Sequence, residues 1–200
     1  MTEQQLIDGL SKLGTAENRH GELAFKYIVD TYQAVIYNTC IGIVGDADDA
    51  KDIAQDVFIQ LYKSADSFRG DSKISTWLYR IAVNKSLNHI RNNKKHKVLL
   101  RIQGFFAADE TREIQIRDRA RSNPQEISEQ NEHKVALRTA IDSLPENQKT
   151  AFVLKNYDDI SYKEISEIME LSLSSVESLI HRAKKNLQKT LNYYYHNNVK

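Results

Sequence analysis

Between Ser72 and Ala108 the chain contains no acidic residue, whereas basic residues recur throughout this stretch and aromatic residues stand near its start. A basic helical face neutralises phosphates, and an aromatic ring stacks on an unpaired base with a stabilisation of about 1–3 kcal/mol. The whole sequence nets only +1, so its positive and negative charges are segregated along the chain. The stretch therefore predicts a surface that binds a polyanion. Its fixed positive charges are Lys73, Arg80, Lys85, Arg91, Lys94, Lys95, Lys97 and Arg101.

A helix across the first half of this stretch would bring aromatic, basic and amide side chains onto neighbouring faces. Amide side chains read base edges, and stacking helps to hold a strand unpaired. A lone tryptophan on a helix also serves as a core residue, so the sequence leaves the role of Trp77 open. The candidate contacts to an unpaired strand are Trp77, Arg80, Asn84, Lys85, Asn88 and Arg91.

Aspartates gather between Asp46 and Asp56, on a second expected helix. Acids in a first turn suit the helix dipole, which accounts for Asp48 and Asp49 but does not reach Asp56. We interpret the acidic face as a docking surface for a basic protein, formed by Asp48, Asp49, Asp52, Gln55 and Asp56. The alternative is a nuclease that binds a metal through these acids. It is disfavoured because no histidine accompanies them, and we expect no metal, no cofactor and no catalytic residue.

Serine-to-glutamate pairs three residues apart predict helix starts in the C-terminal part of the chain. These capping boxes are Ser143 with Glu146, Ser161 with Glu164, and Ser174 with Glu177. The helix after the third pair is amphipathic and carries no acid after Glu177. Short helices, a tight turn and a longer basic helix together indicate a helix-turn-helix.

The outward side chains of that last helix fit contacts with duplex DNA. Serine and histidine donate or accept at base edges, and arginine and lysine neutralise phosphates. A solvated amphipathic helix with lysines in its last turn is the alternative. Glu177 either accepts a hydrogen bond from cytosine or completes the capping box, and the capping role is favoured here. The candidate duplex contacts are Ser174, Ser175, Glu177, Ser178, His181, Arg182 and Lys185.

Helical spacing of apolar residues nearly everywhere predicts an all-α protein with two helical domains. The first domain, 20–97, is a three-helix bundle with helices at about 22–44, 48–63 and 75–95, the last capped by Ser72 or Ser75. A flexible linker follows at 98–129, partly helical around 111–121, and a four-helix domain with the helix-turn-helix occupies 130–192. The expected core consists of Leu23, Tyr27, Ile28, Tyr32, Val35, Ile36, Cys40, Ile53, Val57, Phe58, Leu61, Leu78, Ile81, Ala82, Leu87, Ile90, Val135, Leu137, Ile141, Leu144, Ala151, Phe152, Leu154, Ile165, Ile168, Met169, Val176, Ile180, Ala183 and Leu187.

The cysteine count and the distribution of apolar residues indicate where the protein is found in the cell. The single cysteine, Cys40, excludes an internal disulfide and lies among apolar residues, so we expect a buried, inert thiol. No apolar run approaches the ~20 residues that span a bilayer, and the N-terminus lacks the pattern of a signal peptide. A cytoplasmic protein is expected.

Three segments in this order resemble the extracytoplasmic-function (ECF) class of bacterial RNA polymerase sigma factors. They are DADDAKDIAQDVFIQLYKSADSF, STWLYRIAVNKSLNHIR and SLPENQKTAFVLKNYDDISYKEISEIMELSLSSVESLIHRAKKNL. The first two resemble the family's region 2 and the last its region 4, and the likeness extends over about 20–97 and 130–190. A helix-turn-helix alone would be weak evidence, but its pairing with STWLYRIAVN at this distance is specific.

The resemblance implies a role for each segment in promoter-directed transcription initiation, without enzymatic activity or a small-molecule substrate. The helix with Asp52, Gln55 and Asp56 would dock on the clamp coiled coil of core polymerase. The helix from Trp77 to Arg91 would hold the melted minus-ten strand, mainly through Asn84, Lys85, Asn88 and Arg91, and the last helix would read the duplex minus-thirty-five element. The linker would thread toward the polymerase active site and RNA exit. The family also implies an anti-sigma factor, often membrane-bound, as a partner.

Departures from the common family pattern fall at specificity positions. Asn88 stands where many members carry aspartate, and Glu177 and Leu179 stand where many carry basic residues. The promoter sequence therefore does not follow from the resemblance. An ordinary DNA-binding regulator with a helical effector domain is the competing hypothesis, but it leaves the acidic face and the Trp77 helix unexplained.

Overall fold

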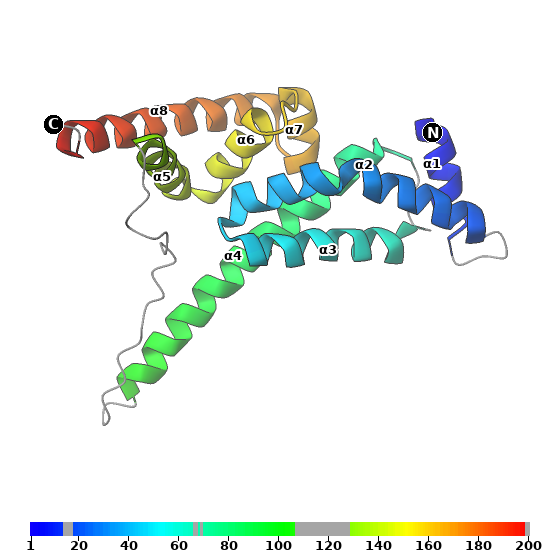
Figure 1. The fold of residues 1–200 in the computed structure, drawn as a ribbon, viewed down its shortest axis with the longest axis horizontal. Coiled ribbons are helices and arrows are strands. Elements are labelled where there is room, and N and C mark those ends of the chain that lie inside the picture. Colours follow the sequence, from blue (N-terminus) through cyan, green and yellow to red (C-terminus); the bar gives the residue numbers. More distant parts are fainter. Residues whose placement is uncertain (14–17, 66–67, 69, 107–128, 199–200) are drawn as a thin grey trace.

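The computed structural model describes residues 1–13, 18–65, 68, 70–106 and 129–198 (Figure 1). All regular elements in these ranges are helices, which confirms the all-α prediction. Helices α1 to α4 form one bundle, called here the N-terminal bundle, and α5 to α8 form the C-terminal bundle. Figure 1 shows the two bundles side by side, with the far half of α4 projecting away from both.

The N-terminal bundle consists of α1 (Glu3–Leu10), α2 (Asn18–Val44), α3 (Ala47–Lys63) and α4 (Ile74–Phe106). Gly45 ends α2 with a φ of 86°, a left-handed conformation that favours glycine. The Asp46 carboxylate then accepts hydrogen bonds from the amides of Asp48 (3.1 Å) and Asp49 (2.9 Å), so it caps α3. The core joins all four helices through Leu10, Ile28, Ile36, Val57, Leu61, Ile74 and Leu78.

Helix α4 differs from its prediction at both ends. Its first amide, that of Ile74, donates to the carboxylate of Glu3 on α1 at 2.6 Å, so neither Ser72 nor Ser75 supplies the cap. At the other end α4 runs to Phe106, so residues 98–106 are helical rather than linker. No proline interrupts this segment, and Leu99, Leu100, Arg101 and Gln103 favour a helix. The helical turn expected around 111–121 lies outside the described residues.

The C-terminal bundle consists of α5 (Glu129–Asp142), α6 (Glu146–Asn156), α7 (Tyr162–Met169) and α8 (Leu173–Asn198). Helix α7 ends at Glu170, whose φ of 55° turns the chain within a few residues into α8. The resulting α7–turn–α8 unit is the predicted helix-turn-helix. The core of the C-terminal bundle contains Leu154, Ile165, Ile168, Val176, Ile180 and Ala183.

Only one of the three predicted capping boxes forms. The Ser161 hydroxyl accepts from the amide of Glu164 (3.2 Å), and the Glu164 carboxylate accepts from the amide of Ser161 (3.3 Å). The Ser143 box is wrong: its hydroxyl donates to the Ala140 carbonyl at the end of α5. The Ser174 box is also wrong, because α8 begins at Leu173, two residues earlier than a cap at Ser174 would place its start.

Ser172 supplies the cap of α8 instead. Its hydroxyl accepts from the amide of Ser175 at 3.2 Å, and its carbonyl accepts from the amide of Val176. Glu177 therefore lies two residues beyond the position, Ser175, from which a side chain could complete the capping box favoured from the sequence. Its side chain is exposed.

Some predicted core positions face solvent. Leu23, Tyr27, Val135 and Leu137 are all exposed, and Ala24, Ala136 and Ala140 occupy the buried positions beside them. Small residues lie where two helices approach closely, which a ranking by hydrophobicity alone does not reveal. The other predicted core residues are buried, except for a set that is only partly buried: Tyr32, Val35, Phe58, Ile81, Ile90, Phe152 and Met169. Cys40 is among the buried residues, and burial raises the pKa of its thiol to about 11.

The bundles are packed directly against each other. Ile43 of α2 and Val83 and Leu87 of α4 share an apolar cluster with Val153 and Leu154 of α6. Gly42 permits this approach, because a Cβ atom there would lie 2.6 Å from the Val153 side chain. In the described ranges no helix has the length and apolarity required to span a membrane.

Candidate nucleic-acid interface

The predicted strand-binding residues follow one another along α4, but they do not share one environment. Trp77 is half-buried against the core, and its ring stacks on Phe68 with centroids 4.5 Å apart and planes 16° apart. Asn84 and Asn88 are exposed one turn apart and remain available to a ligand. Lys85 pairs with Asp56 of α3 at 3.2 Å. The predicted strand contacts therefore differ in exposure along α4, and their role stays a prediction.

Arginines on the same helix contact the C-terminal bundle. Arg80 donates to the backbone carbonyl of Glu167 (2.9 Å) and lies 3.5 Å from the Glu170 carboxylate. Arg91 lies 3.4 Å from the carboxylate of Glu146. The first predicted basic residue, Lys73, pairs with Glu164 at 3.0 Å. These contacts connect α4 to α6 and α7.

Helix α8 presents its predicted duplex contacts outward. Ser174, Glu177, Ser178, His181, Arg182 and Lys185 are exposed. Ser175 is partly buried and takes part in the cap of the helix. A shallow depression of about 560 Å³ is lined by Glu177, Ser178, His181 and Arg182. Hydrogen-bond donors, acceptors and a guanidinium thus lie around one shallow depression on the exposed face of α8.

Helix α3 divides its acidic residues between internal pairs and solvent. Asp49 lies 3.0 Å from His89, and Asp56 pairs with Lys85, both on α4. Asp48, Asp52 and Gln55 are exposed. These contacts join α3 to α4, while Asp56 keeps 60% of its side chain exposed, so the docking surface predicted from the sequence stays a prediction.

An apolar groove lies beside Gln55, between α2 and α3. It has a volume of about 400 Å³ and is lined by Phe25, Val29, Gln55, Phe58, Ile59, Tyr62 and Lys63. Ile59 and Tyr62 are exposed, which is unusual for large apolar residues lying next to each other. This groove was not predicted from the sequence, although its signal lies in the apolar residues at outward positions of α3 after Asp56, Ile59 and Tyr62.

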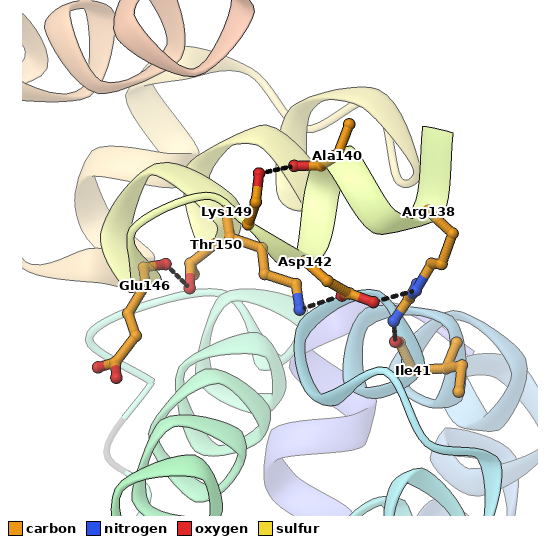
Figure 2. Close-up of polar contacts among 8 residues, drawn as sticks. Ile41, Arg138, Ala140, Asp142, Glu146, Lys149 and Thr150 are labelled. Carbon is orange, nitrogen blue, oxygen red and sulfur yellow. Dashed lines mark hydrogen bonds and ion pairs between the residues drawn. The ribbon is translucent and has the colours of Figure 1, made fainter. Parts of the chain in front are cut away.

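A polar cluster fixes α5 and α6 onto the end of α2 (Figure 2). Arg138 donates to the carbonyl of Ile41 at 2.7 Å, so it caps one of the last carbonyls of α2. Its Nε also donates to Asp142 at 3.2 Å. Asp142 accepts in turn from the buried Lys149 at 2.6 Å. Burial lowers the pKa of Lys149, and the Asp142 carboxylate opposes that effect.

We expect Asp142→Asn to lower the free energy of unfolding by about 1–2 kcal/mol, because it leaves the Lys149 ammonium without its counter-charge. Asp142 is 42% exposed, which keeps the loss below that of a fully buried pair. Since the folded state lowers the pKa of Lys149, the loss should shrink as the pH rises through that lowered pKa toward 10.5. Urea unfolding of both proteins from pH 7 to 10 measures this.

Asp159→Asn is the matched control for that experiment. Asp159 is 94% exposed and pairs only with Lys155 within the same bundle, and asparagine tolerates its φ of 48°. The free energy of unfolding of Asp159→Asn should differ from that of the wild type by less than about 0.5 kcal/mol. A loss at Asp142 that is equal at all pH values would contradict the role of Lys149.

Other functional candidates escaped the sequence analysis because their partners are distant in the chain. Lys94, which was not among the predicted strand contacts, pairs with Glu146 at 2.8 Å. Glu146 was interpreted as a capping residue, yet its carboxylate reaches α4. In the described part of the chain no group of three or more His, Cys, Asp or Glu side chains is placed to hold a metal ion.

Family models match both bundles. Residues 28–96 match the model of sigma-70 region 2, and residues 134–187 match a model of sigma-70 region 4. The first range includes the predicted strand contacts of α4 and the acids of α3, and the second includes the helix-turn-helix. Together they cover more than half of the chain.

Full-length relatives agree with these matches. The chain is 31% identical to the RNA polymerase sigma-H factor of Pseudomonas aeruginosa, with 94% of this chain and 93% of the relative covered. It is 36% identical to the ECF RNA polymerase sigma factor SigW of Bacillus subtilis (84% and 89% covered). It is 32% identical to the ECF RNA polymerase sigma-E factor of Escherichia coli (92% of each).

Solved structures share the fold. The structure of CnrH in complex with the cytosolic domain of CnrY aligns with a TM-score of 0.66 at 18% identity, over 96% of this chain and 97% of that one. The sigma factor RpoE from Bartonella quintana, in complex with the anti-sigma factor NepR, aligns with a TM-score of 0.61 at 21% identity, over 84% and 96%.

Proposed function

Because this chain belongs to the ECF group of the sigma-70 family of RNA polymerase sigma factors, we propose that each of its charged helical surfaces serves one step of transcription initiation. As a sigma factor, the protein directs core RNA polymerase to specific promoters and is not itself an enzyme. The division of labour among the surfaces is our proposal. We assign residues 20–97 to core docking and strand capture, and residues 130–192 to duplex recognition.

The exposed face of α8 is the observation that best supports the assignment of duplex recognition. Glu177, Ser178, His181 and Arg182 surround one depression, and no acid follows Glu177 along the helix. Because Glu177 does not take part in capping α8, its carboxylate can accept a hydrogen bond from the amino group of a base. We propose that these residues, with Ser174, Ser175 and Lys185, read the upstream promoter element.

Helix α4 carries the proposed contacts with the melted strand. Asn84 and Asn88 are exposed and suited to base edges, and Arg80, Lys85 and Arg91 are suited to phosphates. Trp77 offers the exposed part of its ring for stacking, while its buried part rests on Phe68. We add Lys94 to this set because it lies one turn from Arg91 on an exposed part of the helix.

Core polymerase docking is proposed for α3 and the groove beside it. Asp48, Asp52 and Gln55 provide exposed polar contacts, and the groove provides an apolar area for a helical partner. A clamp coiled coil with basic and apolar side chains fits both. Asp49 and Asp56 contribute less directly, since they pair with α4.

Two further proposals concern the partner and the location. Both structural neighbours are described in complex with another protein, in one case an anti-sigma factor. We therefore propose an anti-sigma factor as a partner of this chain, membrane-bound in the form that many family members use. Since the protein acts on core polymerase, we place it in the cytoplasm.

Transcription from a randomised template pool tests the proposed function. Core polymerase is incubated with the protein on templates whose upstream region is randomised, and the transcripts are sequenced. We expect protein-dependent transcripts that share two upstream sequence elements. Absence of such transcripts, together with absence of binding to core polymerase, would overturn the proposal. Tight binding of the protein alone to a duplex operator would favour the ordinary regulator.

A further inference from the structure

Helix α1 supplies the cap of α4 from a position 71 residues earlier in the chain. Oε1 of Glu3 accepts a hydrogen bond from the amide of Ile74 at 2.6 Å, and Ile74 is the first residue of α4. The first amides of a helix have no acceptor within that helix, and a carboxylate beside them also interacts favourably with the helix dipole. The position at which α4 begins therefore depends on α1.

Close packing fixes α1 on the N-terminal bundle. Gly9 lies so near α2 that a Cβ atom in its place would come within 2.4 Å of the Ala24 Cβ atom, and Leu10 is buried in the core. The start of α1 is closed by a capping box of its own. The Thr2 hydroxyl accepts from the amide of Gln5 (3.3 Å), and the Gln5 side chain accepts from the amide of Thr2 (2.9 Å). The helix that carries the capping glutamate is thus held in place along its length.

The connection between α3 and α4 also rests on α1 (Figure 1). Gly70 in this connection has a φ of 75°, and a Cβ atom there would lie 3.4 Å from the Cδ1 atom of Ile7. Two residues earlier, Phe68 stacks on Trp77, which lies in the first turn of α4. Helix α1 therefore contacts both segments that hold the Trp77 ring, the connection before it and the helix start that carries it.

Electrostatic effects place the Glu3 carboxylate where α1, α2 and the start of α4 meet. Burial raises the pKa of the Tyr32 hydroxyl on α2, and the negative charge of Glu3 raises it further. The pKa of Lys73, directly before α4, is raised by its hydrogen bond to Glu164, and Glu3 adds to that effect. The Glu3 side chain is otherwise exposed, whereas Ile74 is fully buried. Replacing Glu3 thus removes a cap without opening a cavity in the core.

We propose that Glu3 is a positioning residue for strand capture, which sets the start of α4 and thereby the orientation of the Trp77 ring toward an unpaired base. This inference rests on the proposed strand-binding role of α4. Glu3 itself contacts no nucleic acid and acts through Trp77. A ring whose plane is fixed before the strand arrives binds a base at a lower entropic cost than a mobile ring. The range that matches region 2 begins at residue 28, so it does not include α1.

The intrinsic fluorescence of the free, full-length chain tests the positioning directly. Trp77 is the only tryptophan of the sequence, so its emission reports on this ring alone. We expect Glu3→Ala to raise the acrylamide quenching constant about twofold, because a helix start without its cap frays and exposes the ring. Glu3→Gln keeps a side-chain oxygen that accepts from the Ile74 amide and should restore most of the wild-type value.

Asp8→Asn is the matched control for both variants. Asp8 is an exposed acid of the same helix, and its carboxylate accepts from Gln4 within α1. Its replacement removes one negative charge from α1 without changing the cap of α4. Trp77 quenching in this control should equal that of the wild type. Circular dichroism should show the same helix content in all four proteins.

Transcription separates positioning from a general loss of stability. On a promoter recovered from the randomised templates, we expect Glu3→Ala to lower the rate of open-complex formation about fivefold, an effect of the size expected for the loss of one helix cap. Its affinity for core polymerase should stay within about twofold of the wild type, because α3 and the groove beside it are unchanged. Glu3→Gln should recover most of the rate.

The outcomes distinguish this inference from the proposed function. Wild-type quenching of Trp77 in Glu3→Ala would overturn the positioning role, whatever the transcription result. Equal changes in Glu3→Ala and Asp8→Asn, or a loss of core affinity as large as the loss of open-complex formation, would also overturn it. Absence of core-dependent transcription with the wild-type chain would instead overturn the proposed function, while the quenching measurement would still decide whether Glu3 holds the Trp77 ring.

Discussion

Replacing Arg182 with glutamate is expected to lower promoter-dependent transcription about a hundredfold. Arg182 is exposed on α8 at the depression shared with Glu177, Ser178 and His181. A guanidinium contact to a base edge or phosphate contributes about 1–3 kcal/mol, and a carboxylate in its place adds repulsion from the DNA. A total near 3 kcal/mol corresponds to about two orders of magnitude in affinity. Transcription with core polymerase on a selected promoter measures the change.

Lys134→Glu provides the matched control for this charge reversal. Lys134 is exposed on α5, which packs against the later part of α8, away from the depression at Glu177 to Arg182. The control should retain transcription within about threefold, because long-range charge effects are screened at physiological salt. Binding of Arg182→Glu to core polymerase should equal that of the wild type. Equal losses in the two variants would mean that net charge, not a contact by α8, governs promoter binding.

The helices themselves could be predicted from apolar spacing, but not which residues face inward. Leu23 and Tyr27 form one stripe of α2, and Ala24 and Ile28 form another beside it. The structure buries the stripe with alanine because α1 approaches closely there. On α5, likewise, Ala136 is buried and its neighbour Val135 is exposed. Periodicity reports an amphipathic helix, whereas the choice between adjacent stripes depends on neighbours that a local window does not contain.

Helix starts show the same limit. The Ser161 box could be predicted because both of its hydrogen bonds are local. The start of α4 could not, because its cap comes from Glu3, far earlier in the chain. Before α8 the sequence contains several serines that could cap the helix, at 172, 174 and 175. In the structure Ser172 is the cap, so Glu177 does not take part in a capping box. Local rules thus located the helices, while contacts between distant segments determined their ends.

The candidate sites follow in part from local sequence patterns and in part from contacts between segments that are distant in the chain. Charge segregation and residue type identified α3, α4 and α8 as three distinct surfaces. The pairing of Glu146 with Arg91 and Lys94 joins residues more than 50 positions apart and has no local sequence signal. The apolar groove between α2 and α3 likewise combines outward positions of two helices. Folding therefore revised which members of each predicted set are available to a ligand.

Replacing Asp52 with lysine is expected to weaken binding to core polymerase by about thirtyfold or more. Asp52 is an exposed acid on α3 beside Gln55 and the apolar groove, and no pairing with α4 engages it as it does Asp49. Loss of an attractive contact and its replacement by like-charge repulsion at an interface cost about 2 kcal/mol or more. Fluorescence titration of labelled protein with core polymerase measures this affinity.

Asp56 is a poorer choice for this test, because its replacement would also break the pair with Lys85 and alter α4. Asp30→Lys is the better control: it reverses one exposed acid of the same bundle, on a part of α2 outside the groove. Both variants should keep the wild-type free energy of unfolding within about 0.5 kcal/mol, since both side chains are exposed. If Asp52→Lys binds core polymerase as tightly as Asp30→Lys does, the clamp does not dock on this face of α3. The groove would then need a different occupant.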